Sequence, residues 1–141
     1  MMSFIEPHQQ NDKDDYPPPD GYREQYAGRW TPPDLAALPA YPDDDDRLGG
    51  STQQHLAGYW GMVKRLDEAL GRVCDALKSL GLIDDTILVF TSDHGCHFRT
   101  RAAEYKRTAH ESSIRVPTML HGGPFSEGPT VRQLTSLVDI A

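Results

Sequence analysis

The apolar positions of the chain form one long helical stripe. From Tyr59 to Leu80, apolar residues recur at steps of three and four, which is the period of one helix face. Charged residues fall mostly off this stripe, and Gly81 is a natural C-terminal cap. The pattern predicts an amphipathic helix near Thr52–Leu80 that packs on a sheet.

A short continuous apolar run follows the helix and predicts a strand over Thr86–Ser92. A run without polar interruptions is typical of a strand that is buried on both faces, as in a parallel sheet. Further strands are expected at Ser3–Glu6 and Thr118–His121, and short helical turns within Ala102–Lys106 and Val131–Ile140. A helix, a glycine, a turn and a buried strand make half of a βαβ unit, so the fold class is α/β with a mostly parallel sheet between helices.

Residues 9–50 follow neither pattern. Prolines interrupt any helix or strand here, yet aromatic residues are interleaved with them, and a disordered tail is normally poor in aromatics. We interpret the stretch as a long ordered loop over a larger body, and residues 51–141 as the helix and strand half of one partial domain. Tyr22, Tyr26 and Trp30 could line a sugar or aryl site, and the alternative is that they pack over the core.

Composition narrows the function classes. The 141 residues suffice for one domain, and much of the net charge of −7 lies in the acidic runs Asp12–Asp15 and Asp43–Asp46. There is no basic footprint for nucleic acid and no apolar run of roughly 18 residues for a membrane span. The first residues lack the features of a signal peptide, which leaves the compartment open with the cytoplasm as default, and the oligomeric state is also open.

The candidate chemistry follows the predicted strand. Asp93 and His94 stand at its carboxyl end, where open α/β sheets place ligands, and a carboxylate beside an imidazole is an ordinary pair of metal ligands. A polar turn is the alternative. The next segment is rich in cationic side chains, which would bind a sulfate or phosphate ester beside a metal, or would form a solvated basic loop. These residues are His97, Arg99, Arg101, Lys106, Arg107, His110 and Arg115.

Several motifs together resemble the C-terminal part of the sulfatase catalytic domain, in the alkaline-phosphatase-like superfamily. The helix LDEALGRVCDALKSLGL precedes IDDTILVFTSDHG, and Lys106 follows Asp93 by 13 residues. Glu111 and Arg115-Val116-Pro117 come next, and the opening stretch Phe4–His8 is similar to the family strand that ends in a Pro-His pair. The resemblance spans nearly the whole chain and implies a partial alkaline-phosphatase-like sandwich.

The resemblance also implies roles for particular residues. Asp93 and His94 would bind a divalent cation, usually calcium in sulfatases, with Mn²⁺ or Mg²⁺ left open. Lys106 would contact the sulfate oxygens, and His8 would face the sulfate or the leaving-group oxygen, although a plain loop histidine is the alternative. The implied substrate is a sulfate ester of a small molecule or glycan.

The chain also departs from the family pattern. The Cys/Ser-X-Pro-X-Arg motif that provides the formylglycine nucleophile is absent, and Cys96-His97-Phe98-Arg99 does not match it. The N-terminal Asp-Asp metal pair is absent too. We therefore interpret the chain as a sulfatase-like fragment or diverged remnant that is inactive alone. A phosphodiesterase or phosphonate-ester hydrolase, and a non-catalytic truncated pseudoenzyme, are the alternatives.

Overall fold

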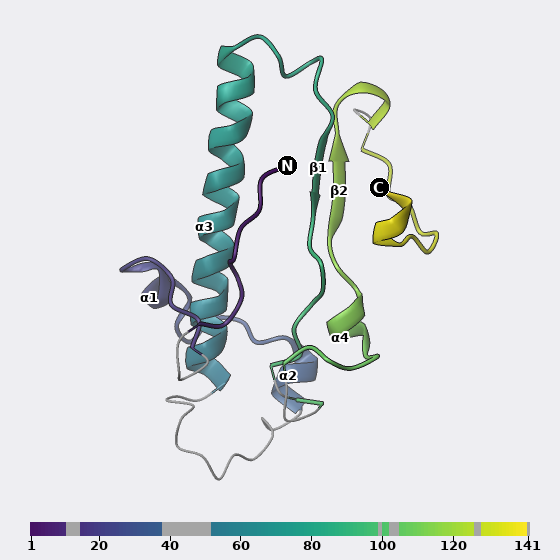
Figure 1. Cartoon of the computed structure of the whole chain (residues 1–141). Coiled ribbons are helices and arrows are strands. Elements are labelled where there is room, and N and C mark those ends of the chain that lie inside the picture. The colour runs from purple at the N-terminus through teal and green to yellow at the C-terminus, as the bar shows by residue number, and fades with distance from the viewer. Residues whose placement is uncertain (11–14, 38–51, 99, 102–104, 126–127, 141) are drawn as a thin grey trace.

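The computed structural model describes residues 1–10, 15–37, 52–98, 100–101, 105–125 and 128–140. One long helix, α3, is accompanied by several short helices, turns and strands (Figure 1). In chain order the helices and strands are α1 (Tyr22–Tyr26), α2 (Pro33–Ala37), α3 (Thr52–Ser79), β1 (Leu88–Thr91), α4 (Glu111–Ile114) and β2 (Thr118–His121), and a 3₁₀ turn at Leu137–Asp139 lies near the C-terminus. None of the helices in the described ranges is both long and apolar enough to cross a membrane.

The helix α3 confirms the periodicity of the sequence, because its 28 residues span nearly the predicted range. Its end has the hydrogen bonds of a Schellman motif. The Leu82 amide donates to the Leu77 carbonyl oxygen at 2.8 Å, and the Gly81 amide donates to the Lys78 carbonyl oxygen at 3.0 Å. Gly81 adopts φ of 68°, which glycine tolerates without strain, so the predicted cap is confirmed.

The buried core lies against the N-terminal half of α3. It consists of Tyr16, Met62 and Tyr105, with the partly buried side chains of Tyr59, Cys96 and Phe98 packed on it, and we call these six residues the aromatic core. The helix α1 also packs on this half of α3. The expected packing of the helix on a sheet is not confirmed, because in the described elements α1 and the aromatic core pack on α3.

The sheet differs from the expected one. The strands β1 and β2 pair antiparallel, with Leu88 opposite His121 and Thr91 opposite Thr118, so the mostly parallel sheet is not what the described residues form. Parallel strands need a helical crossover, whereas the connection here contains only the four-residue helix α4 in its described part. Burial along β1 alternates between half-buried and exposed positions, so the expected burial on both faces is also wrong.

Of the remaining predicted strands and turns, some are present in the structure and others are not. Thr118–His121 forms β2 as predicted, and the strand over Thr86–Ser92 shortens to β1. Residues Ser3–Glu6 form no strand, and no strand partner pairs with them in the described part of the chain. The turn expected within Ala102–Lys106 lies mostly outside the described residues, and the one within Val131–Ile140 appears as the 3₁₀ turn.

Candidate functional site

The carboxyl end of β1 presents Asp93 and His94 in a hydrogen-bonded turn. The His94 amide donates to Oδ1 of Asp93 at 2.9 Å, and the Ser92 hydroxyl donates to the His94 carbonyl oxygen at 3.0 Å. Burial raises the pKa of the Asp93 carboxyl, but the hydrogen bonds from the His94 amide and the Ser92 hydroxyl, together with the charge that the His94 ring carries when it is protonated, outweigh this effect. The pKa of Asp93 is therefore below its ordinary value, and the side chain is an anion at neutral pH.

The turn continues through a position that only glycine fits. The Gly95 amide donates to the Ser113 carbonyl oxygen at 2.7 Å, which ties the end of β1 to α4. A Cβ atom at position 95 would lie 2.2 Å from the Ser112 carbonyl oxygen, so any other residue would push the two segments apart. The close approach explains the glycine in Asp-His-Gly.

His94 is oriented by its own neighbour. Its Nδ1 lies 2.9 Å from the Gly95 carbonyl oxygen, so a neutral ring carries its proton on Nδ1 and leaves a lone pair on Nε2. That Nε2 lies 3.4 Å from Oδ2 of Asp93. Two ligands at right angles around one Ca²⁺ are also roughly 3.4 Å apart, because each bond is about 2.4 Å. The pair therefore fits as two ligands of one cation.

Asp93 and His94 alone do not complete the coordination sphere of a metal ion. Within the described ranges, no group of three or more His, Cys, Asp or Glu side chains could hold a metal ion. Asp93 and His94 alone would leave most positions of a six- to eight-coordinate calcium ion to water or to other groups.

Lys106 and His8 meet although they are 98 positions apart. The Lys106 ammonium donates to Nε2 of His8 at 3.0 Å, while Nδ1 of His8 is bonded to the Gln9 carbonyl oxygen. An ammonium has no lone pair, so Nε2 accepts this hydrogen bond and the His8 ring is neutral in this arrangement. His8 is exposed and Lys106 is half-buried, which leaves the pair accessible from solvent.

The aromatic core connects these two pairs of residues. The Tyr16 hydroxyl lies 3.2 Å from the sulfur of Cys96, three residues after Asp93, and the His97 amide donates to the Tyr105 carbonyl oxygen at 2.8 Å. Burial raises the pKa of the Cys96 thiol, and the charge of Lys106 acts in the opposite direction. The segment after Asp93 and the segment before Lys106 are thus packed on the same rings.

The segment after Asp93, which is rich in Arg, Lys and His, presents only some of these side chains as exposed cations. Arg101, Arg107 and His110 are exposed, Arg115 pairs with Glu111 at 3.6 Å, and Arg99 lies outside the described residues. His97 is instead fully buried, and neither ring nitrogen has a hydrogen-bond partner in the described part of the chain. Desolvation lowers the pKa of His97, so it does not contribute a cation.

Two core residues were missed by reasoning from the sequence. Tyr16 is 1% exposed although it precedes three prolines, and Tyr105 is buried directly before Lys106. For Tyr16 the available signal was the interleaving of aromatic residues with prolines, which does not say which ring is buried.

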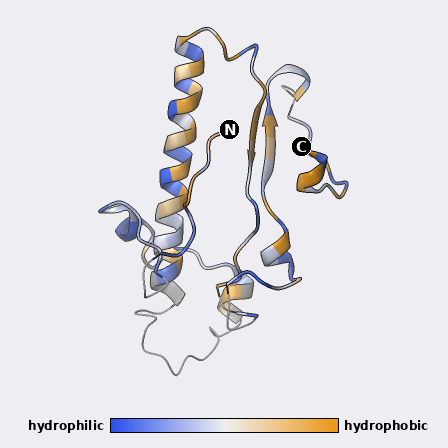
Figure 2. Cartoon of the chain, viewed as in Figure 1, coloured by the Kyte–Doolittle hydropathy of each residue, from blue (hydrophilic) through white to orange (hydrophobic). Residues whose placement is uncertain are grey.

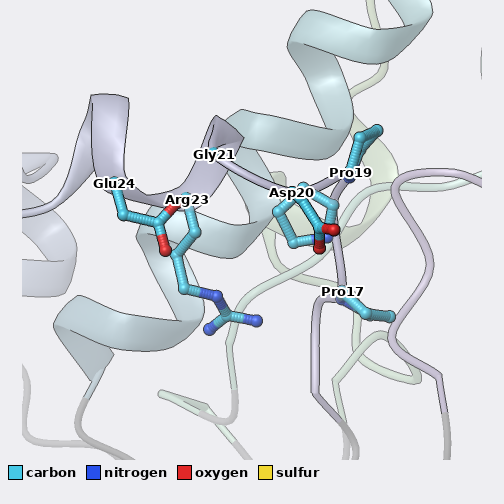
Figure 3. Close-up of a pocket in the computed structure, with 7 residues that line it drawn as sticks. Pro17, Pro19, Asp20, Gly21, Arg23 and Glu24 are labelled. Atoms are coloured by element: carbon cyan, nitrogen blue, oxygen red, sulfur yellow. The ribbon is translucent and has the colours of Figure 1, made fainter.

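A separate hollow lies beside α1, away from these residues. Its volume is about 400 Å³, and Pro17, Pro18, Pro19, Asp20, Gly21, Arg23 and Glu24 line it. Figure 3 shows Arg23 and Glu24 projecting from α1 while Asp20 projects from the proline segment. Arg23 is engaged elsewhere, because its guanidinium donates to the Asp15 carboxylate at 2.8 Å and to the Tyr16 carbonyl oxygen at 2.8 Å. This hollow contains none of the four predicted site residues.

Comparison with known proteins decides the family. The Sulfatase family model matches residues 1–141. The chain belongs to the sulfatase family. Arylsulfatase K of Bos taurus is 37% identical over 84 residues, and arylsulfatase K of Homo sapiens is 36% identical over the same length. These matches cover 60% of this sulfatase chain and 16% of each relative.

Solved structures give the fold. A protein assigned as a sulfatase, yidJ from Bacteroides fragilis, superposes with a TM-score of 0.60 at 32% identity, over 74% of this chain and 23% of the other. A structure from work on glycosaminoglycan metabolism by Bacteroides thetaiotaomicron superposes with a TM-score of 0.61 at 24% identity, over 84% of this chain and 23% of the other. The chain thus adopts part of the alkaline-phosphatase-like fold of sulfatases.

Proposed function

We propose that this chain contributes the metal- and sulfate-binding residues of a sulfatase-like hydrolase that cleaves sulfuric esters, and that it does not hydrolyse them alone. The observation that carries the proposal is the 3.0 Å contact between Lys106 and His8, which joins two candidate residues that are 98 positions apart in the chain. Family membership supports a hydrolase of this class.

Lys106 and His8 would act on the ester group itself. A sulfate ester carries its negative charge on peripheral oxygens, and an ammonium at those oxygens stabilises further charge in the transition state. The His8 imidazole, once protonated on Nε2 and released from the Lys106 hydrogen bond, can give that proton to a leaving-group oxygen within hydrogen-bond reach. The Lys106–His8 pair therefore offers both functions at one point.

Asp93 and His94 would hold a divalent cation, with Ca²⁺ favoured and Mn²⁺ or Mg²⁺ as alternatives. When bound, such an ion would polarise the ester oxygens. The contribution of the chain is to keep the Asp93 carboxylate ionised and to fix the His94 ring through the Gly95 carbonyl oxygen.

The inactivity of the isolated chain rests on its sequence. No Cys/Ser-X-Pro-X-Arg motif occurs in the 141 residues, so the nucleophile of the sulfatase family is missing from it. The same observation favours a non-catalytic binding module as a second candidate function. A phosphodiesterase or phosphonate-ester hydrolase of the same superfamily would use similar anion contacts and a different nucleophile.

Anion binding is tested on the whole chain by thermal unfolding with and without sodium sulfate, since only a ligand that prefers the folded state raises the midpoint. We expect sulfate to raise the midpoint, and Lys106→Ala to remove most of the rise. Lys64→Ala is the matched control, because Lys64 is engaged with Glu68 at 3.5 Å on α3. Equal responses of the two variants would exclude Lys106 as the anion contact.

Metal binding and turnover need their own measurements. Calorimetric titration with Ca²⁺ should give weak binding that Asp93→Asn abolishes, and the variant should keep its fold because Asp93 is exposed. An aryl sulfate assay with added Ca²⁺ or Mn²⁺ should stay at the blank rate. If the chain hydrolyses the aryl sulfate above the blank rate, the claim that it is inactive alone is disproved. If Lys106→Ala also removes this activity, the assignment of Lys106 to the site still holds.

A further inference from the structure

We propose that Ser113 and Thr108 are positioning residues for Lys106. Their side-chain hydroxyls lie 2.8 Å apart, and we call this contact the hydroxyl bridge. The bridge connects Lys106 to the turn that carries Asp93 and His94, so it sets where the candidate anion contact lies relative to the candidate metal ligands. The inference rests on the proposed function for the roles of these residues, but it can be tested without a ligand.

Ser113 is tied to the turn after β1. The Gly95 amide, which follows His94, donates to the Ser113 carbonyl oxygen at 2.7 Å, and α4, which contains Ser113, lies beside this end of β1 (Figure 1). The Ser113 residue is only 2% exposed, so its hydroxyl is shielded from solvent. A buried hydroxyl needs a hydrogen-bond partner, and the Thr108 hydroxyl provides it.

Thr108 is tied to Lys106. Its amide donates to the Lys106 carbonyl oxygen at 2.9 Å, which closes a tight turn around Arg107. Together with the bond from Gly95 to Ser113, backbone hydrogen bonds therefore fasten both ends of the hydroxyl bridge. The bridge is the side-chain step in a continuous path of hydrogen bonds from the metal-ligand turn to the lysine.

A lysine side chain depends on its main chain for placement. Its four-carbon stem is flexible, and holding it in one geometry costs conformational entropy. Before Lys106, Tyr105 is buried and its carbonyl oxygen accepts from the His97 amide at 2.8 Å. After Lys106, the main chain is held through Thr108. Fastening on both sides restricts where the ammonium can reach and favours its 3.0 Å contact with His8.

A purely stabilising role for the hydroxyl bridge is the alternative. A satisfied buried hydroxyl stabilises a fold wherever it lies, so the contact alone does not assign a function. Thr91 and Thr118 form a second pair of hydroxyls, 3.1 Å apart across β1 and β2. This pair joins the two strands and does not involve the segment of Lys106, so it provides a matched control.

The contact between Lys106 and His8 gives a spectroscopic readout. Nε2 of His8 accepts the hydrogen bond from the ammonium, and the resonance of an imidazole nitrogen depends on its protonation and on its hydrogen-bond donor. NMR of the whole chain with isotope-labelled histidine measures this resonance at pH 8, where imidazoles are ordinarily neutral and ammonium groups are charged. Lys106→Ala defines its position without the contact, and His8→Gln identifies the signal among the 6 histidines.

Ser113→Ala and Thr108→Val each remove one hydroxyl of the bridge and leave the side chains of Lys106 and His8 unchanged. We expect both variants to move the His8 Nε2 resonance towards its position in Lys106→Ala. Thr108→Ser keeps the hydroxyl and should retain the native position, and Thr118→Val, the control, should retain it too. A native resonance in either Ser113→Ala or Thr108→Val would overturn the inference, because a lowered unfolding midpoint alone is what a purely stabilising contact gives.

Thr108 also guards the test against a failure to fold. Ser113 is buried and Thr108 is half-buried, so Thr108→Val should keep the native circular dichroism spectrum even if Ser113→Ala does not. The comparison of Thr108→Val with Thr108→Ser then decides the inference by itself.

Sulfate separates this inference from the proposed function. If Lys106 contacts the anion, Thr108→Val should reduce the rise of the unfolding midpoint with sodium sulfate, and Thr108→Ser should retain it. If sulfate does not stabilise the native chain, the anion role of Lys106 fails, while the His8 resonance still decides whether the hydroxyl bridge positions the lysine. A native His8 resonance in Thr108→Val overturns the positioning role in either case.

Discussion

The two ends of α3 lie in opposite environments although one apolar stripe runs along the whole helix. At its N-terminal end, Leu56, Ala57 and Met62 are each at most 2% exposed, and Met62 belongs to the aromatic core. From Gly71 to Ser79 every described position is exposed or half-buried. Figure 2 shows apolar colour continuing along the helix and onto β1 and β2, where Val89 and Met119 are 45% and 54% exposed.

This difference between the two ends of α3 shows which part of the structure holds the candidate site residues in place. Cys96 and Tyr105, the neighbours of the predicted site residues, are packed in the aromatic core. Only the end of β1 reaches the site from the open region. The packed end should therefore control both stability and site geometry, while the open end should tolerate change, and variants at the two ends can break or sharpen this contrast.

The largest effect is expected for Tyr16→Ala. The side chain is 1% exposed and contacts the rings of His55, Tyr59, Phe98 and Tyr105, so its removal leaves a cavity at the centre of the core. We expect a loss of about 3–5 kcal/mol in the free energy of unfolding, measured by urea denaturation. Tyr16→Phe keeps the ring and loses only the contact with Cys96, which should cost about 1 kcal/mol. Equal costs would show that the hydroxyl matters more than packing.

Alkaline pH probes the same core. Burial, with a smaller contribution from Cys96, raises the pKa of Tyr59 to about 12 from 10.0 in the unfolded chain. The unfolded chain therefore loses its proton first, and the stabilisation that is intact below pH 10 is lost as pH rises towards 12. The loss should reach about 2–3 kcal/mol. Tyr16, whose pKa burial also raises, acts in the same direction.

Urea denaturation between pH 9 and pH 12 measures this loss. Tyr59→Phe should flatten the decrease, since the variant has no proton to lose at this position. An unchanged slope in the variant would locate the titration at another group.

The sequence predicted the local features well. The stripe of α3 and the Gly81 cap depend on residues within a few turns of each other, so periodicity and φ preference suffice to find them. The direction of the β1–β2 pairing could not be predicted in this way, because it depends on how the chain returns between the strands.

The candidate site shows the same division. Asp93 and His94 were recognisable from their position after an apolar run, whereas the contact between His8 and Lys106 spans 98 positions and only the family resemblance brought the two residues together. Tyr16 could not be assigned to the core, because a ring between an acidic run and three prolines is typical of a loop. Burial there is set by the close approach of Gly58, which no local pattern reveals.

Two glycines on α3 provide a matched pair for the contrast between its ends. A Cβ at Gly58 would lie 2.2 Å from the Tyr16 carbonyl oxygen, whereas a Cβ at Gly71 meets nothing within 4 Å. Gly58→Ala should therefore destabilise the fold by about 1–3 kcal/mol through overpacking. Gly71→Ala should stabilise it by up to about 1 kcal/mol through helix propensity. Thermal unfolding should show a lower midpoint for Gly58→Ala and a higher midpoint for Gly71→Ala. If both variants are stabilised, the two ends of α3 do not differ in packing.

The smallest effect is expected on the open sheet. Val89 lies on the exposed side of β1 and is 45% exposed, so Val89→Thr keeps a β-branched side chain and removes little buried apolar surface. We expect a change within about 0.5 kcal/mol in the free energy of unfolding, measured by urea denaturation at two protein concentrations. A loss above about 1.5 kcal/mol that grows with protein concentration would mean that another molecule covers this face in solution. The open end of the structure would then be an interface, and the contrast with the packed end would hold only for the single chain.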